Sequence, residues 1–125
     1  PHALRELRLM SERSGIPIVS FGHAGDGNIH VNIMVEKESP DEYKRGLELV
    51  REVFAMTIAA GGSISGEHGI GILKEPYIEM ELKEQELDLM RSIKRTFDPK
   101  GTLNPGKVFT PAPRFDMRES QIPLF

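Results

Sequence analysis

Three of the four histidines lie in two glycine-rich segments, where their spacing is suited to metal binding. His23 and His30 flank an Asp26-Gly27 pair, a dipeptide that predicts the tight turn of a β-hairpin. Two histidines that face each other across a hairpin can place imidazole nitrogens within reach of one ion. We therefore expect His23 and His30 to be two ligands of a metal ion.

A third ligand must come from another part of the chain, and Glu67 is the candidate. Gly66 and Gly69 free the backbone around it for a close approach. Two histidines and one carboxylate leave coordination positions open, which suits a catalytic metal. Zinc is the first expectation, whereas iron(II) and manganese(II) accept the same kinds of ligand. Adjacent side chains point in different directions, so His68 is expected to act as a general base instead of a ligand.

Each of these residues also has a simpler interpretation. Asp26-Gly27 can form an ordinary turn, a strand histidine can be a hydrogen-bonded surface group, and Asn32 can be solvated. The Gly66-x-x-Gly69-x-Gly71 spacing differs from the dinucleotide pattern G-x-G-x-x-G and follows no clear strand–turn–helix unit. The occurrence of both glycine-rich segments in one chain is what favours a functional site.

The elements that must position these residues follow from hydrophobic periodicity and turn signals. A helix is predicted up to Ser14, then a strand over 17–21 and a second strand over 29–35. The second strand alternates, with its aliphatic residues on one face and His30 and Asn32 on the other.

A second helix is predicted to begin at Ser39 with a capping box that includes Glu42, and to end at Gly61-Gly62. Its predicted apolar stripe is Tyr43, Leu47, Val50, Phe54 and Ile58. A short strand is expected from Ser63, and a last helix is expected to end at Asp98-Pro99.

This order predicts an α+β fold, a ferredoxin-like antiparallel sheet with helices on one face, followed by C-terminal helices. The unit would be truncated, because its first strand is missing. Residues 1–109 would form this domain and residues 110–125 an irregular tail. The chain begins at Pro1, directly in a helical pattern, so we expect it to be a piece of a longer protein.

The composition of the 125 residues limits the classes of function. With 38% hydrophobic and 28% charged residues the chain is typical of a globular domain. A net charge of −3 argues against nucleic acid as a partner, and the lack of cysteine excludes disulfides and cysteine-ligated zinc. We expect a cytoplasmic protein, either free or held at a membrane through a partner protein.

Three motifs occur in a recognisable order: Gly22-His-Ala-Gly-Asp-Gly-Asn-Ile-His-Val-Asn32, Gly61-Gly-Ser-Ile-Ser-Gly-Glu-His-Gly-Ile-Gly71 and Phe97-Asp-Pro-Lys-Gly-Thr-Leu-Asn-Pro-Gly-Lys107. Together they resemble the C-terminal region of FAD-linked oxidases of the vanillyl-alcohol-oxidase type. Within that family the sequence is most similar to D-lactate dehydrogenase, D-2-hydroxyglutarate dehydrogenase and the flavin-linked component of glycolate oxidase. The resemblance implies a flavoprotein that oxidises a D-2-hydroxy acid to the 2-keto acid by hydride transfer to FAD.

The resemblance also implies roles for individual residues. In metal-dependent members the positions of His23, His30 and Glu67 bind zinc, and the position of His68 is the proposed base. Asn32 would contact the substrate, and Asn104 would lie near the flavin.

The family's FAD-binding domain lies N-terminal to this region, so the chain alone is expected to be inactive and to bind metal weakly. Expected partners are that domain, the hydroxy acid, and an electron acceptor such as a quinone, a flavoprotein or an iron–sulfur subunit. A second copy of the chain could pair through the open sheet face. Two alternatives stay open: a self-standing metal-binding or interaction module, and a zinc hydrolase with Glu67 or His68 as its base.

Overall fold

The computed structural model describes residues 2–23 and 25–109, and the predicted tail lies outside these residues. The chain divides into two compact units, with the division after Gly66. Within the described residues, no helix is long and apolar enough to cross a membrane.

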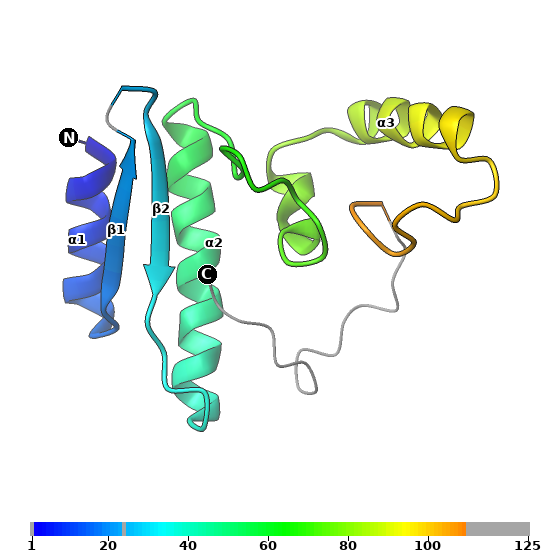
Figure 1. Cartoon of the computed structure of the whole chain (residues 1–125). Helices are drawn as coiled ribbons and strands as arrows, with labels where there is room; N and C mark the ends of the chain where they lie inside the picture. Colours follow the sequence, from blue (N-terminus) through cyan, green and yellow to red (C-terminus); the bar gives the residue numbers. More distant parts are fainter. Residues whose placement is uncertain (1, 24, 110–125) are drawn as a thin grey trace. The chain divides into compact units, whose positions relative to one another are not determined.

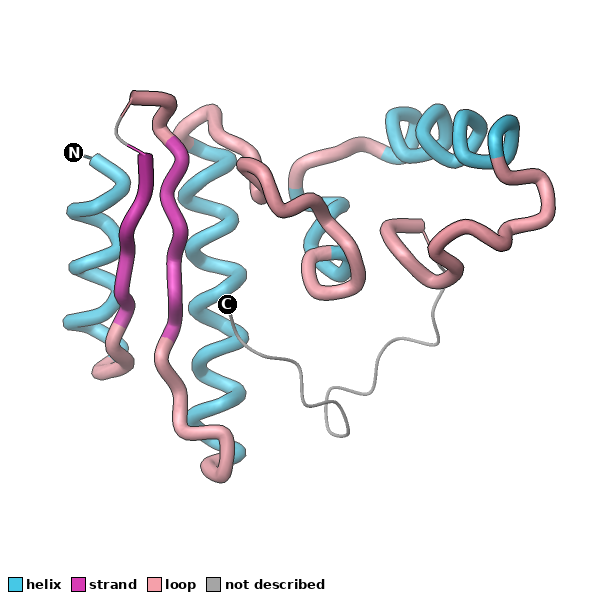
Figure 2. The backbone as a smooth tube through the Cα atoms, viewed as in Figure 1, coloured by secondary structure: helices cyan, strands magenta, loops and turns pink. Residues whose placement is uncertain are grey.

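The N-terminal unit consists of two helices and one β-hairpin (Figure 1). Helix α1 (His2–Ser14) is followed by strands β1 (Ile18–His23) and β2 (Asn28–Ile33), and then by helix α2 (Pro40–Ala59). The strands pair antiparallel, and the two helices lie along the same hairpin (Figure 2). Helix α1 contacts β1 and α2, and α2 contacts β2, so that both helices cover one face of the sheet. The predicted α+β class, with helices on one face of an antiparallel sheet, is confirmed.

The hydrophobic core of this unit lies between the hairpin and the helices. Its buried residues come from α1, β2 and α2 and from the segments next to β1 and α2, namely Leu7, Ile16, Ile33, Leu49, Val50, Val53, Phe54 and Ile64. On the opposite face of the sheet, Val19 and Phe21 keep 51% and 57% of their surface exposed. The strand alternation therefore separates a packed face from an open one.

Helix α2 begins at the predicted residue, although its cap differs from the expected one. Ser39 is the N-cap, and its hydroxyl accepts a hydrogen bond from the backbone N–H of Glu42 at 3.4 Å. The Glu42 carboxylate accepts from the backbone N–H of Glu36 at 3.0 Å. The reciprocal bond from Glu42 to Ser39 that a capping box needs is replaced by this contact, since the incoming chain brings Glu36 within reach.

The buried face of α2 is rotated from the predicted stripe. The helix buries Gly46, Leu49, Val50, Val53 and Phe54. The predicted stripe residues Tyr43, Leu47 and Ile58 are only half-buried. Periodicity alone marks an apolar side of a helix, whereas the partners of α2 on two sides, α1 and β2, decide which residues face the core.

The strand expected from Ser63 is wrong, because the described residues between α2 and residue 75 contain no strand. Helix α2 ends instead in a Schellman motif. The N–H of Gly62 donates to the carbonyl of Thr57 at 2.9 Å, and the N–H of Gly61 donates to Ile58 at 2.9 Å. The chain then runs as an irregular segment, and the sheet of the described residues has two strands.

The C-terminal unit contains a 3-10 helix, η1 (Glu75–Met80), and helix α3 (Glu84–Phe97). Its buried apolar residues are Tyr77, Ile78 and Leu87. The predicted end of the last helix is confirmed, whereas η1 was not expected from the sequence. Asp98 follows α3 as its C-cap and is 6% exposed, the one buried charged residue of the described chain.

Acid is expected to weaken the C-terminal unit through Asp98. The Lys94 ammonium, helped by the backbone N–H groups of Leu103 and Thr102, lowers the pKa of Asp98 from 3.8 to about 2, although burial acts in the opposite direction. A carboxylate with a lowered folded-state pKa stabilises the fold above its unfolded pKa. That stabilisation is lost as the pH falls from about 4 to about 2.

Urea unfolding of the chain at about pH 5 and about pH 2.5 measures this loss. The Asp98→Asn variant should lose less stability between the two pH values than the unmodified chain. If the Asp98→Asn variant and the unmodified chain lost the same free energy of unfolding between the two pH values, Asp98 would not be the source of the acid sensitivity. Asp88→Asn, an exposed aspartate of α3, is the matched control.

Candidate metal centre

The hairpin brings His23 and His30 onto its open face. His23 is the last residue of β1 and is paired with Asn28, while His30 is paired with Phe21. Because side chains alternate along a strand, His23 and Phe21 share a face with Asn28 and His30. The two histidines are therefore diagonal neighbours across the strands, and their ring centroids lie 5.9 Å apart.

The turn between the strands holds the backbone of His23. The carbonyl of His23 accepts hydrogen bonds from the N–H groups of Asp26 at 3.4 Å and Gly27 at 3.2 Å. The Asp26 carboxylate then accepts from the N–H of Asn28 at 3.2 Å. The predicted Asp26-Gly27 turn is thus present, and its hydrogen bonds hold the backbone of His23 at the end of β1.

Phe21 orients the second histidine. Its ring stacks on the imidazole of His30, with centroids 4.9 Å apart and an angle of 18° between the ring planes. The stack covers one face of the imidazole, so that the nitrogens at the ring edge keep their access to a ligand. His30 is half-buried, whereas His23 is exposed.

The residue before Glu67 lies close to the hairpin. A Cβ atom on Gly66 would lie 2.5 Å from the side-chain oxygen of Asn28, so a larger residue at position 66 would require the Asn28 side chain to move. Asn28 is the first residue of β2. Glu67 follows Gly66 directly in the chain and is the first residue of the C-terminal unit.

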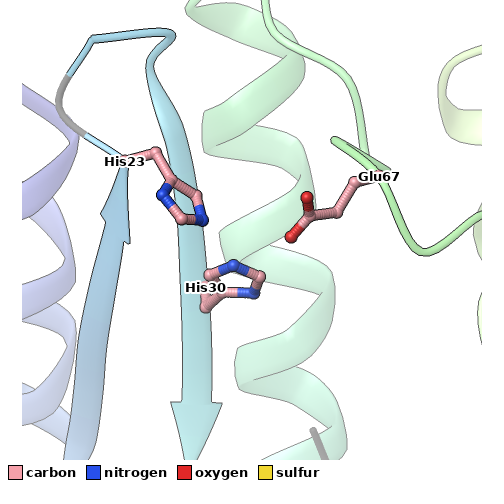
Figure 3. Close-up of side chains that lie close together, drawn as sticks. All are labelled: His23, His30 and Glu67. Atoms are coloured by element: carbon pink, nitrogen blue, oxygen red, sulfur yellow. The ribbon is translucent and has the colours of Figure 1, made fainter.

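The three predicted ligands come together (Figure 3). One ligand atom from each of His23, His30 and Glu67 lies within 4.8 Å of the other two. Ligand atoms around tetrahedral zinc, at bonds of about 2.0–2.1 Å, are about 3.4 Å apart. Two imidazoles and a carboxylate fit zinc in type and number, and a closure of about 1–1.5 Å would complete the geometry.

His68 lies beside the cluster without belonging to it. Its Nε2 atom is 3.6 Å from Oε1 of Glu67, and its side chain is 67% exposed. The neighbouring side chains thus approach each other more closely than the sequence argument assumed.

The two predicted asparagines lie in different units. Asn32 lies on β2, two residues beyond His30, and is paired with Val19 of β1. Its side chain is on the open face of the sheet. Asn104 lies in the C-terminal unit, in the loop that follows α3. It is exposed, and its φ of 46° is in the left-handed region that asparagine tolerates better than most residues.

Three interactions that shape the site or the loop before Asn104 were not predicted from the sequence. The stack of Phe21 on His30 could have been found, since Phe21 is two residues before His23 and must share its face. The contact of Asn28 with Gly66 had no local signal. Asp98 was seen only as part of a helix end, although its carboxylate organises the loop that leads to Asn104.

Residues 1–108 match the family described as FAD linked oxidases, C-terminal domain. The match covers most of the 125 residues, and the chain belongs to this family. The three motifs, with His23, His30 and Glu67, all lie within the matched range.

Individual relatives carry names of related kinds. The chain is 47% identical to glycolate oxidase subunit GlcD of Bacillus subtilis over 94 residues, 75% of this chain and 20% of the relative. It is 43% identical to D-lactate dehydrogenase of Archaeoglobus fulgidus over 99 residues, 79% of this chain and 21% of the relative. For D-2-hydroxyglutarate dehydrogenase of Stutzerimonas stutzeri the identity is 43% over 94 residues, 74% of this chain and 20% of the relative. The chain thus spans about a fifth of the length of these curated relatives.

Proposed function

We propose that this chain is the metal- and substrate-binding part of a flavin-dependent dehydrogenase that converts a D-2-hydroxy acid into the 2-keto acid. The observation that carries the proposal is the His23–His30–Glu67 cluster in a chain that belongs to the FAD-linked oxidase family. Relatives named for glycolate, D-lactate and D-2-hydroxyglutarate support this class of substrate.

His23, His30 and Glu67 would hold a zinc ion, with open positions for the carboxylate and hydroxyl of the acid. Bound zinc supplies Lewis-acid polarisation, which makes that hydroxyl more acidic. Asn32 lies two residues beyond His30 on the same strand face, where its amide can hydrogen-bond the substrate. These residues would orient the α-carbon and its hydrogen for transfer.

His68, whose Nε2 atom lies 3.6 Å from Oε1 of Glu67, would take the proton of the substrate hydroxyl. The α-hydrogen leaves with its electron pair, and bound FAD supplies the acceptor for this hydride. The alcohol thus loses one proton and one hydride and becomes the carbonyl. Asn104 is the residue that this chain would place near the flavin, which is held mainly by an N-terminal domain of the parent protein.

A zinc hydrolase would use the same three ligands with a metal-bound water, and Glu67 or His68 as base. The family match favours the dehydrogenase, because a hydrolase needs no flavin. The family match also disfavours a self-standing metal-binding module, because such a module would need no flavin either.

Visible spectroscopy of the parent protein tests the proposal. We expect the absorption band of oxidised flavin, and its bleaching when one of glycolate, D-lactate or D-2-hydroxyglutarate is added without oxygen. The acid that bleaches the band names the substrate. A parent protein without flavin, or a flavin that none of the D-2-hydroxy acids reduces, would contradict the proposed reaction.

A further inference from the structure

The loop after α3 is organised by one buried carboxylate. Asp98 Oδ1 accepts hydrogen bonds from the backbone N–H of Thr102 at 2.9 Å and from its hydroxyl at 3.3 Å. Oδ2 accepts from the N–H of Leu103 at 2.9 Å and forms an ion pair with Lys94. Lys94 Nζ also donates to the carbonyl oxygen of Leu103 at 2.7 Å. Asp98 and Lys94 therefore hold both peptide groups of Leu103.

This arrangement determines how the chain enters Asn104. The carbonyl of Leu103, held by Lys94, belongs to the peptide bond that leads into Asn104. Asn104 itself has a φ of 46°, and the ring of Pro105 restricts the backbone on its other side. Fixed peptide groups before it and a proline after it leave the asparagine little freedom to change its backbone direction.

Asp98 is buried although it does not lie in a large apolar core. Around it, Phe97 and Leu103 keep 81% and 60% of their surface exposed. Burying a charge is unfavourable unless hydrogen bonds and an opposite charge compensate it, and here nearly all of the compensation comes from the loop and from Lys94. The interaction network thus stabilises one conformation of the residues before Asn104.

We propose that Asp98 and Lys94 are positioning residues that hold Asn104 in the conformation needed for its contact with the flavin. The inference rests on the proposed function, which places Asn104 near that cofactor. Neither Asp98 nor Lys94 would touch the flavin, and both would act through the Leu103–Asn104 peptide.

The test uses the flavin-containing parent enzyme and the variants Asn104→Ala, Asp98→Asn and Lys94→Met. Lys100→Met, a change of an exposed lysine in the same motif, is the matched control. The readouts are the visible spectrum and midpoint potential of the bound flavin, with kcat and KM measured separately. Lys94→Met keeps the Asp98 carboxylate and its backbone donors, so it gives a second variant to measure if Asp98→Asn does not fold.

We expect Asp98→Asn and Lys94→Met to shift the spectrum and potential in the same direction as Asn104→Ala. We expect them to lower kcat by about 10-fold to 100-fold, the range for residues that orient a metal's ligands, with a smaller effect on KM. When combined with Asn104→Ala, these two substitutions should cause little further loss of kcat, because the side chain through which they would act on the flavin is already absent. Lys94→Arg should restore much of the loss.

Full additivity with Asn104→Ala would overturn the positioning role, as would an unchanged spectrum and potential in both the Asp98→Asn and Lys94→Met variants. If Asn104→Ala alone changes neither readout, the proposed contact between Asn104 and the flavin is wrong, and the inference fails with it. The dehydrogenase activity itself is tested separately by the bleaching of the flavin, so the two failures are distinguishable.

Discussion

Replacement of His23 by alanine is expected to weaken zinc binding by at least about 100-fold. Loss of a residue that only orients a metal ligand reduces affinity by about 10-fold to 100-fold, and the loss of a ligand should exceed that range. His23 is one of three side chains whose ligand atoms lie within 4.8 Å of one another, so two protein ligands would remain. Two ligands hold zinc poorly compared with the three of a typical catalytic site.

Competition with a chromophoric zinc chelator measures the affinity, and elemental analysis of the purified parent identifies the metal. His2→Ala is the matched control, because His2 lies at the start of α1, outside both glycine-rich motifs. Glu67→Gln and His30→Ala should behave as His23→Ala does. Zinc affinity unchanged by all three substitutions would contradict the site.

The same titration can separate ligands from the residues that orient them. Phe21→Leu keeps an apolar side chain but removes the ring that stacks on His30 at 4.9 Å. Its effect should be smaller than that of a lost ligand, about 10-fold. Phe21→Tyr keeps the ring and should bind zinc as the unmodified protein does.

Replacement of His68 by alanine in the parent enzyme is expected to slow reduction of the flavin by about 100-fold to 10,000-fold, the usual contribution of a general base. His68 lies 3.6 Å from Glu67 and outside the three-residue cluster. Zinc content and flavin content should therefore stay close to those of the unmodified enzyme. The two variants would then differ: His23→Ala would lose zinc affinity, whereas His68→Ala would keep its zinc and lose only the rate of flavin reduction.

Stopped-flow measurement of flavin absorbance after anaerobic mixing with the reducing acid gives this rate directly. His2→Ala again serves as the control, with no change expected in rate or metal content. A His68→Ala enzyme that reduces its flavin at the normal rate would show that another group removes the proton. Loss of zinc in the same variant would show that His68 acts as a ligand.

Much of the site could be predicted from residues close together in the sequence. The Asp26-Gly27 turn and the alternation of β2 are local features, and together they place His23, His30 and Asn32 on one face of a hairpin. The glycines beside Glu67 indicated a close approach of the backbone without showing what it approaches. The proposal of Glu67 as third ligand thus depended on chemistry, and its place beside the histidines was decided by the fold.

Only the tertiary structure decided the contacts between distant residues. Gly66 meets Asn28, Phe21 stacks on His30, and α2 turns Leu49 and Val53 toward the core in place of Leu47 and Ile58. The strand expected from Ser63 was wrong, because strand propensity needs a partner to pair with, and the described sheet ends with β1 and β2. Local sequence determines which residues favour a turn, a strand or a helix end. Which side chains then meet depends on how the completed elements pack, and a period of 3.6 or 2 residues carries no information about that partner.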